Sequence, residues 1–116
     1  MTISERTNGS VCILDIEGPI VVGRGSADLL ADKVRSLLQQ GQKQLIINLA
    51  GVPYMDSTGL GAMVHAYATA TRQGGSVKLL HVTKKLHDLL VITKLATVFE
   101  SFENEPAALA SFRAAV

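Results

Sequence analysis

The chain has 116 residues, a length typical of one domain, which we expect to span residues 1–116. Eleven basic and ten acidic residues leave a formal net charge of +1, and no basic run is longer than Lys84-Lys85, which argues against a nucleic-acid-binding surface. Hydrophobic residues make up 47% of the chain, yet no apolar stretch approaches the roughly 18 residues of a membrane span. We therefore expect no direct membrane insertion.

The amino terminus and the single cysteine indicate the compartment. Residues 1–6 contain no apolar signal core, so we expect a soluble chain that is complete as written. Cys12 lies in an apolar run and cannot form an internal disulfide, which favours a buried core position. Both observations indicate a protein of the reducing cytoplasm.

The first residues predict a β-hairpin followed by a loop. Residues 2–7 and 11–17 flank Asn8-Gly9, a dipeptide that favours a tight turn between paired strands. The glycine-punctuated stretch 18–25 predicts a loop with a short extended piece at residues 20–22.

A helix and a buried strand follow this loop. Ser26 begins a helix that reaches about Gln40 and ends at Gly41. Its largely apolar stripe comprises Leu29, Leu30, Lys33, Val34, Leu37 and Leu38. Residues 44–49 form a nearly continuous apolar run, typical of a central parallel strand covered on both faces.

A second helix begins at Ser57 and ends at Gly74-Gly75, and residues 77–82 predict the next strand. The helix is indicated by apolar residues at helical spacing, namely Leu60, Met63, Val64, Tyr67 and Ala68.

The last part of the chain predicts two more helices and a strand. Thr83 can cap a short helix, whose apolar side comprises Leu86, Leu89 and Leu90. Residues 97–102 predict a last strand, and Asn104 with Pro106 starts a terminal helix.

This order of elements predicts an α/β fold. An N-terminal hairpin and then alternating helices and strands form a four- to five-stranded, mostly parallel sheet with helices packed on it. In such sheets the functional edge lies at the carboxyl ends of the strands. The turn at residues 49–57 lies at that edge, and so does the loop at 18–25 if its strand runs the same way.

Ser57 places a hydroxyl at the start of a helix, and two non-catalytic roles fit it. Asp56 or Ser57 can cap the helix by accepting a backbone N–H bond. Gly59 and Gly61 each cost about 1 kcal/mol relative to alanine in a first turn, which favours a bare backbone that another molecule approaches. Phosphorylation of Ser57 would add about 1.5–2 negative charges at a helix end that tolerates anions, so its effect would fall on a partner.

A catalytic serine is the third role, and the surrounding residues disfavour it. The nucleophile elbow of hydrolases reads G-x-S-x-G, but Met55 stands where the first glycine belongs. A triad also needs a placed histidine base. His65 lies more than two turns along the same helix, and we expect His65, His81 and His87 to be structural residues.

Metal and cofactor sites are not indicated. No two histidines lie four residues apart, there is no cysteine pair, and no carboxylate cluster has the spacing of a calcium loop. Gly23-Arg-Gly is followed by Asp28 where a dinucleotide fingerprint needs a third small residue, and no P-loop is present. We therefore expect no cofactor.

At these residues the sequence resembles the STAS domain family, specifically the stand-alone anti-sigma factor antagonists of bacteria. The resemblance is carried by Asp56-Ser-Thr-Gly-Leu-Gly61 after the strand and turn at 45–55, by Gly74-Gly75 before Val77-Lys-Leu-Leu, and by the ending at 95–99. It extends from about Ile3 to Phe112. One departure is Val21, which stands where many family members carry an acidic residue.

The resemblance implies a regulatory binding protein without catalytic activity. Such a protein binds an anti-sigma factor with a histidine-kinase-like ATP-binding fold and frees the sigma factor, until this kinase phosphorylates Ser57. A metal-dependent serine phosphatase reverses the modification. Thr58 is the fallback acceptor, with a second helix cap as its competing role. The implied partner-binding surface comprises Pro19, Ile20, Val21, Val22, Met55, Asp56, Ser57, Thr58, Gly59 and Leu60.

Other STAS proteins regulate anion transporters, serve lipid-transport complexes or belong to stress-sensing assemblies. The alternative function is therefore that of a non-phosphorylated STAS subunit or regulator of a membrane transport complex.

Overall fold

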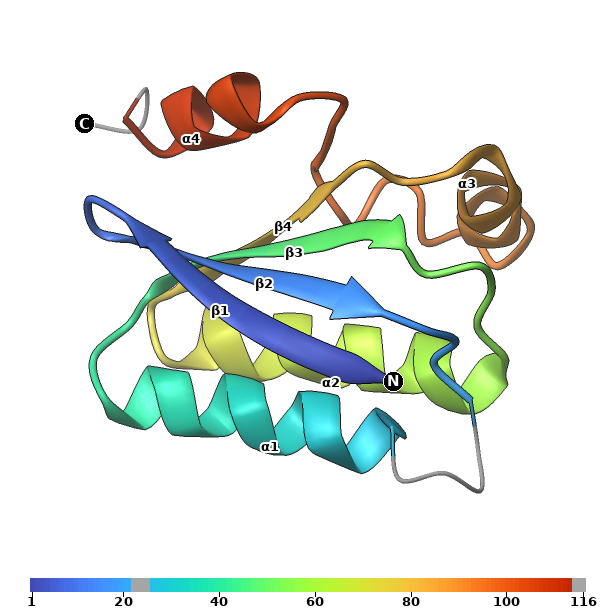
Figure 1. The fold of residues 1–116 in the computed structure, drawn as a ribbon, viewed down its shortest axis with the longest axis horizontal. Helices are drawn as coiled ribbons and strands as arrows, with labels where there is room; N and C mark the ends of the chain where they lie inside the picture. The colour runs from blue at the N-terminus through green and yellow to red at the C-terminus, as the bar shows by residue number, and fades with distance from the viewer. Residues whose placement is uncertain (22–25, 114–116) are drawn as a thin grey trace.

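The chain begins with the predicted hairpin (Figure 1). Strands β1 (Thr2–Asn8) and β2 (Val11–Glu17) pair antiparallel, and the two-residue loop between them is Gly9-Ser10, one position later than expected. Gly9 has a φ of +61°, which glycine adopts without a steric penalty. The computed structural model describes residues 1–21 and 26–113, so residues 22–25 of the loop predicted at 18–25 lie outside the described residues.

The other strands run parallel to β2. They are β3 (Gln44–Gly51), β4 (Ser76–Leu80) and β5 (Ser101–Phe102), and the sheet has the order β1-β2-β3-β4-β5. The predicted α/β class with a mostly parallel sheet is confirmed.

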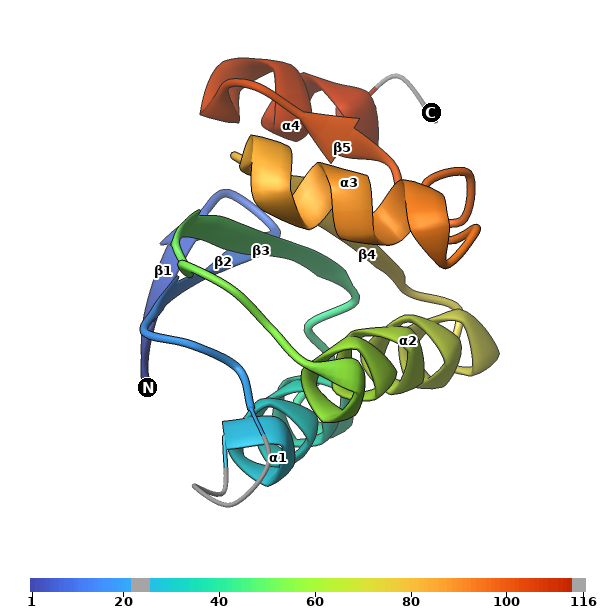
Figure 2. The same ribbon diagram turned by 90° about the vertical axis from the view of Figure 1, so that its right-hand side faces the viewer.

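The helices cover the two faces of the sheet unequally (Figures 1 and 2). Helices α1 (Ser26–Gln39) and α2 (Ser57–Arg72) lie side by side under one face, and α4 (Glu105–Arg113) lies on the opposite face. Helix α3 (Lys84–Ile92) lies beside the carboxyl ends of β3 and β4.

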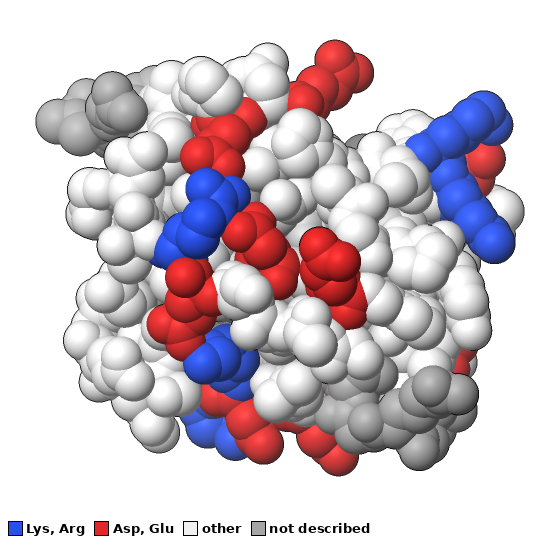
Figure 3. Space-filling view, viewed as in Figure 1, with Lys and Arg blue, Asp and Glu red and all other residues white. Residues whose placement is uncertain are grey.

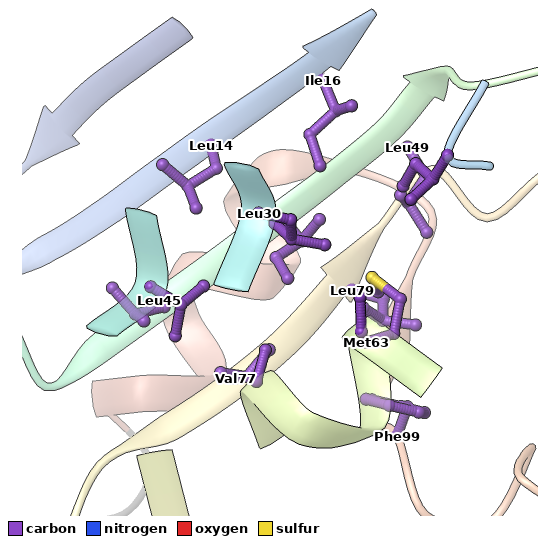
Figure 4. Close-up of a cluster of buried hydrophobic side chains, with 14 of the residues drawn as sticks. Leu14, Ile16, Leu30, Leu45, Leu49, Met63, Val77, Leu79 and Phe99 are labelled. Atoms are coloured by element: carbon purple, nitrogen blue, oxygen red, sulfur yellow. The ribbon is translucent and has the colours of Figure 1, made fainter. Parts of the chain in front are cut away.

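The larger core fills the space between the sheet and the pair α1 and α2 (Figure 4). Along β3, Leu45, Ile47 and Leu49 belong to this core, whereas Ile46 belongs to a smaller cluster under α4. The expectation that β3 is covered on both faces therefore holds at Ile46 but not at its carboxyl end, where Ala50 is exposed. Each fully buried aliphatic side chain stabilises the fold by about 1.5–3 kcal/mol relative to the same side chain in water.

Cys12 lies in the larger core, as predicted. Its side chain is buried against apolar neighbours, and this burial raises the pKa of the thiol.

The stripe predicted for α1 is correct except at its edge. Leu30, Val34, Leu37 and Leu38 are buried, but Leu29 is 44% exposed. Leu29 shares its flank of the helix with Lys33, one turn further on, and Lys33 forms an ion pair with Glu5 of β1. That flank faces the edge of the sheet and not its centre.

The last predicted strand was wrong over most of its length, because residues 97–99 form a turn and only Ser101–Phe102 pairs with β4. Lys94 has a φ of +63°, and the Val98 N–H donates to the carbonyl of Leu95 at 3.0 Å. Backbone donors needed for a longer ladder are thus used inside the turn. Phe99 is buried, with its ring edge against Tyr67 at 5.4 Å between centroids.

The predicted starts of α3 and α4 are confirmed. The Thr83 hydroxyl accepts the Leu86 N–H at 3.4 Å, and the Asn104 side chain accepts the Ala107 N–H at 2.9 Å. Among the described residues, none of the helices is long and apolar enough to cross a membrane.

A band of alternating acidic and basic side chains crosses the hairpin between α4 and α1 (Figure 3). Arg6 of β1 contacts Asp15 of β2 at 2.5 Å and Glu105 of α4 at 2.7 Å. The hydrogen bond from Arg6, assisted by one from Asn48 at 2.8 Å, holds the pKa of Asp15 below its usual value, although partial burial opposes this shift.

We predict that Asp15→Asn lowers the free energy of unfolding at pH 7 by about 1 kcal/mol, because a charge-assisted hydrogen bond at a partly exposed site becomes a neutral one. A lowered folded-state pKa stabilises the protein above the unfolded pKa of about 3.9 and loses this effect as the pH falls through the folded value. The deficit of the variant should therefore shrink below about pH 4. Urea unfolding at pH 7 and pH 2.5 measures both values.

The matched control is Asp32→Asn, which removes an exposed ion pair with Arg35 within α1. It should change the free energy of unfolding by at most about 0.5 kcal/mol at either pH. Equal effects of the two variants would contradict the role assigned to Asp15.

Candidate functional site

The site forms where the chain leaves β2 and β3 at the carboxyl edge of the sheet. Gly18 turns the chain after β2 with a φ of +100°, and its N–H donates to the Gly51 carbonyl at 2.9 Å. Ile20 then pairs with Met55 in a parallel bridge. We call residues 18–21 the strap, because this segment is bound along the connection between β3 and α2.

Two backbone hydrogen bonds attach the strap to that connection. The Ile20 N–H donates to the Tyr54 carbonyl at 3.2 Å, and the Asp56 N–H donates to the Ile20 carbonyl at 3.3 Å. The described part of the predicted loop therefore does lie beside the turn at 49–57, as the strand directions predicted.

Asp56 is the cap of α2. Its backbone is extended, its side chain accepts the Gly59 N–H at 2.9 Å, and its carbonyl accepts the Leu60 N–H at 2.9 Å. Ser57 and Thr58 follow the cap inside the helix, and both are exposed. The second cap expected of Thr58 is therefore wrong, and the Ser57 hydroxyl is not needed to start the helix.

The two glycines of the first turn differ in their surroundings. A Cβ on Gly59 would lie 2.1 Å from the Ile20 carbonyl oxygen, whereas a Cβ on Gly61 would meet nothing within 4 Å. We expected both bare backbones to admit another molecule. At Gly59 this was wrong, because the space is filled by the strap of the same chain.

The residues expected on the partner-binding surface divide into two layers. Ser57 and Thr58 are exposed, and Pro19, Val21 and Asp56 are partly exposed. The buried layer beneath them comprises Ile20, Met55, Gly59 and Leu60. Val22 lies outside the described residues. The buried four support the surface and do not form it.

A catalytic use of Ser57 finds no partner in the described part of the chain. His65, His81 and His87 are all exposed, and no hydrogen bond joins any of them to Ser57 within residues 1–21 and 26–113. The same residues contain no cluster of three or more side chains that could hold a metal ion.

Sequence patterns missed one feature beside the site. Tyr54 and Ile92 are exposed and border a hollow of about 230 Å³ between the β3–α2 connection and α3. A signal was present, because Ile92 lies one turn beyond Leu89 and extends the apolar surface of α3 to a second flank, away from Leu86 and Leu90.

Strap, cap and exposed serine together define an α/β domain that presents a hydroxyl at a helix start. A family model described as the STAS domain matches residues 2–108, and the chain therefore belongs to the STAS domain family. The resemblance predicted from the sequence is confirmed.

The chain is similar to bacterial regulators. It is 41% identical over 75 residues to the anti-sigma-B factor antagonist of Bacillus subtilis (strain 168). These aligned residues cover 65% of this chain and 68% of that relative. Such relatives are regulatory binding proteins rather than enzymes.

Solved structures share the fold at lower identity. A candidate anti-sigma factor antagonist from Thermotoga maritima superimposes with a TM-score of 0.88 and 21% identity, over 96% of this chain and 94% of that chain. The anti-sigma factor antagonist SpoIIAA in its unphosphorylated form has a TM-score of 0.73 and 13% identity, over 99% of this chain and 100% of that chain. SpoIIAA in its phosphorylated form has a TM-score of 0.70 and 16% identity, over 91% of this chain and 96% of that chain.

We predict opposite effects of alanine at the two glycines. Gly59→Ala should lower the free energy of unfolding by about 1–3 kcal/mol, because its Cβ must push the Ile20 backbone away. Gly61→Ala should raise it by about 0.5–1 kcal/mol, because alanine is the better helix former at an open position. Urea unfolding of both variants measures the difference, and equal shifts would contradict the close contact at Gly59.

Proposed function

We propose that this protein is an anti-sigma factor antagonist that is switched off by phosphorylation of Ser57. In its unmodified form it binds a kinase-type anti-sigma factor through the exposed layer around Ser57 and thereby frees a sigma factor. The kinase transfers the γ-phosphoryl group of ATP to the Ser57 hydroxyl, so ADP and a proton are released. A serine phosphatase restores the binding form, and the cycle takes place in the cytoplasm.

The observation that carries the proposal is the division of roles between Asp56 and Ser57. Because the Asp56 side chain already accepts the Gly59 N–H, the exposed Ser57 hydroxyl has no capping duty. A group that is exposed and structurally dispensable can be modified without unfolding the helix. The similarity to an anti-sigma-B factor antagonist supports the class of partner.

A phosphate on Ser57 would alter binding more than folding. The Ser57 and Thr58 N–H groups precede the first intrahelical hydrogen bond, made by the Leu60 N–H, and they face the positive end of the helix dipole. This environment stabilises an anion by about 0.3–2 kcal/mol, and the neighbouring Asp56 carboxylate opposes it. A partner pressed against Pro19 and Val21 must instead desolvate the new charge.

The fold itself is compatible with such a modification. SpoIIAA, which shares this fold, has been solved in both unphosphorylated and phosphorylated forms. Val21 leaves the surface of this chain more apolar than in family members with an acidic residue at this place. We infer that the partner of this chain meets the strap through an apolar contact.

We expect an anti-sigma factor kinase from the same genome, mixed with this protein and ATP, to add one phosphate, and mass spectrometry of the digested protein should locate it on Ser57. Ser57→Ala should abolish the incorporation, whereas Thr58→Ala should leave it within about twofold. Undiminished incorporation in Ser57→Ala, or its loss only in Thr58→Ala, would overturn the assignment of Ser57.

Ser57→Asp should weaken binding of the same kinase by about tenfold or more, since a buried extra charge costs at least 1.4 kcal/mol in an apolar contact. Its thermal midpoint should change by no more than about 2 °C, because the residue is exposed. Isothermal titration calorimetry measures the affinity, and differential scanning calorimetry measures the thermal midpoint. A large loss of stability with unchanged affinity would show that Ser57 serves the helix alone.

The alternative function, a non-phosphorylated subunit of a membrane transport complex, predicts different results. The protein would then co-purify with transporter components and accept no phosphate from any kinase of its genome. Both results together would replace the proposal.

A further inference from the structure

A hollow of about 230 Å³ opens on the flank of the Ser57 site and is lined by residues of α3 and of the segment that leads from β3 to α2. Figure 1 shows these two parts of the chain near each other. Tyr54 and Ile92 border it and are 45% and 78% exposed. Among the described residues, only Leu29 and Val91 are other large hydrophobic side chains with comparable exposure. Half of this exposed apolar set therefore lies at one hollow.

One stripe of α3 forms a wall of the hollow. Lys85, Leu89 and Ile92 follow one another at helical spacing and face Tyr54, while Met55 and Leu86 lie at the buried floor. The ammonium group of Lys85 lies 5.5 Å from the centre of the Tyr54 ring. The hollow thus has an apolar interior, and its rim carries Lys85 and Asp88. Asp88 is paired with Lys84 at 3.1 Å, which leaves Lys85 as the rim charge available to a partner, and the size of the hollow suits a single side chain.

The opposite wall belongs to the same rigid segment as the phosphate acceptor. The Tyr54 carbonyl accepts the Ile20 N–H of the strap. Met55, two residues before Ser57, forms a parallel bridge with Ile20. Tyr54 and Met55, which line the hollow, thus lie three and two residues before Ser57 in the connection that the strap holds.

The exposed layer around Ser57 has five residues, whereas a specific interface contains about 20–30 residues on each side. Specific interfaces bury about 800 Å² on each partner, and the exposed layer consists of Pro19, Val21, Asp56, Ser57 and Thr58. A bound kinase must extend over a neighbouring surface. The Tyr54 hollow offers exposed aromatic and aliphatic groups, the kind that carry most of the energy at the centre of an interface.

We propose that the Tyr54 hollow is the anchoring pocket for the kinase-type anti-sigma factor, which inserts one apolar side chain between Tyr54 and Ile92 and places a carboxylate beside Lys85. This inference rests on the proposed function and adds to it a second contact region outside the serine. The anchor holds the partner through α3, and phosphorylation of Ser57 acts on the other end of the same interface.

Replacement of Ile92 by serine tests the anchor, with its neighbour Val91 as the matched control. Val91 is 52% exposed but lines a different hollow, with Lys94, Ala96 and Thr97. Ile92→Ser should weaken binding of the anti-sigma factor kinase by about tenfold, whereas Val91→Ser should stay within twofold. Both side chains are exposed, so the two thermal midpoints should agree with that of the unmodified chain.

Charge reversal tests the rim. Lys85→Glu should weaken the same complex by about tenfold at low salt and by less at 0.5 M salt, because an attraction becomes a repulsion that salt screens. Lys94→Glu makes the same change in net charge beyond the carboxyl end of α3, at the other hollow, and should leave the affinity within about twofold.

The outcomes separate this inference from the proposed function. If the unmodified chain binds the kinase and is phosphorylated at Ser57, but Ile92→Ser and Lys85→Glu bind as tightly as their controls, the anchoring pocket is overturned and the function stands. If the unmodified chain neither binds nor is phosphorylated, both are overturned. Selective loss at Ile92 and Lys85 supports both.

Discussion

The backbone of Ile20 is the contact on which the functional edge of this protein depends. Its N–H and carbonyl bind the two sides of the β3–α2 connection, at Tyr54 and Asp56, and so extend the sheet by one parallel bridge beyond β2 and β3. This bridge fixes where α2 starts, because the residue that caps the helix is also the residue whose N–H the strap accepts. Without it, Ser57 would sit on a connection held only at β3.

Close approach of two backbones explains the residue types in the first turn of α2. The Ile20 carbonyl can lie over the helix only where Cβ is missing, which requires glycine at position 59 and at no other position of that turn. Asp56 supplies the cap, so the hydroxyls of Ser57 and Thr58 remain at the surface. A motif that looks like a run of helix caps therefore divides into one cap, one close contact and two exposed hydroxyls.

Much of this architecture could be predicted from the sequence, because periodicity and punctuation report burial directly. The hairpin follows from the turn dipeptide Asn8-Gly9, α1 and α2 from helical spacing, and β3 from a nearly continuous apolar run. The end of the chain was less accessible: residues 95–99 are apolar enough for a strand, but whether they pair or turn depends on Lys94 in a left-handed conformation and on the space for Phe99 beside Tyr67. Neither condition is encoded within the segment itself.

The site shows the same limit. Local chemistry predicted that Ser57 opens a helix, but it could not tell that Gly59 faces the chain's own strap, since this contact joins residues far apart in sequence. The resemblance named the residues around Ser57 together, and the structure separates them into an exposed layer and a buried support. Tyr54 and Ile92 lie 38 positions apart in the numbering and meet only because α3 folds back beside the β3–α2 connection.

A switch at Ser57 works only if its free-energy change falls on the complex and not on the fold. Near the helix start, the dipole and the first N–H groups favour a phosphate by about 0.3–2 kcal/mol, and the Asp56 carboxylate, held in place by its bond to Gly59, repels it. These two terms have opposite signs, so their net effect on the folded chain is smaller than that of the helix start alone. A partner has no such compensation, because it removes water from the same charge. Because Asp56 supplies the cap, the start of α2 does not depend on the Ser57 hydroxyl, and under the proposed function the difference between the two states would fall on the binding surface.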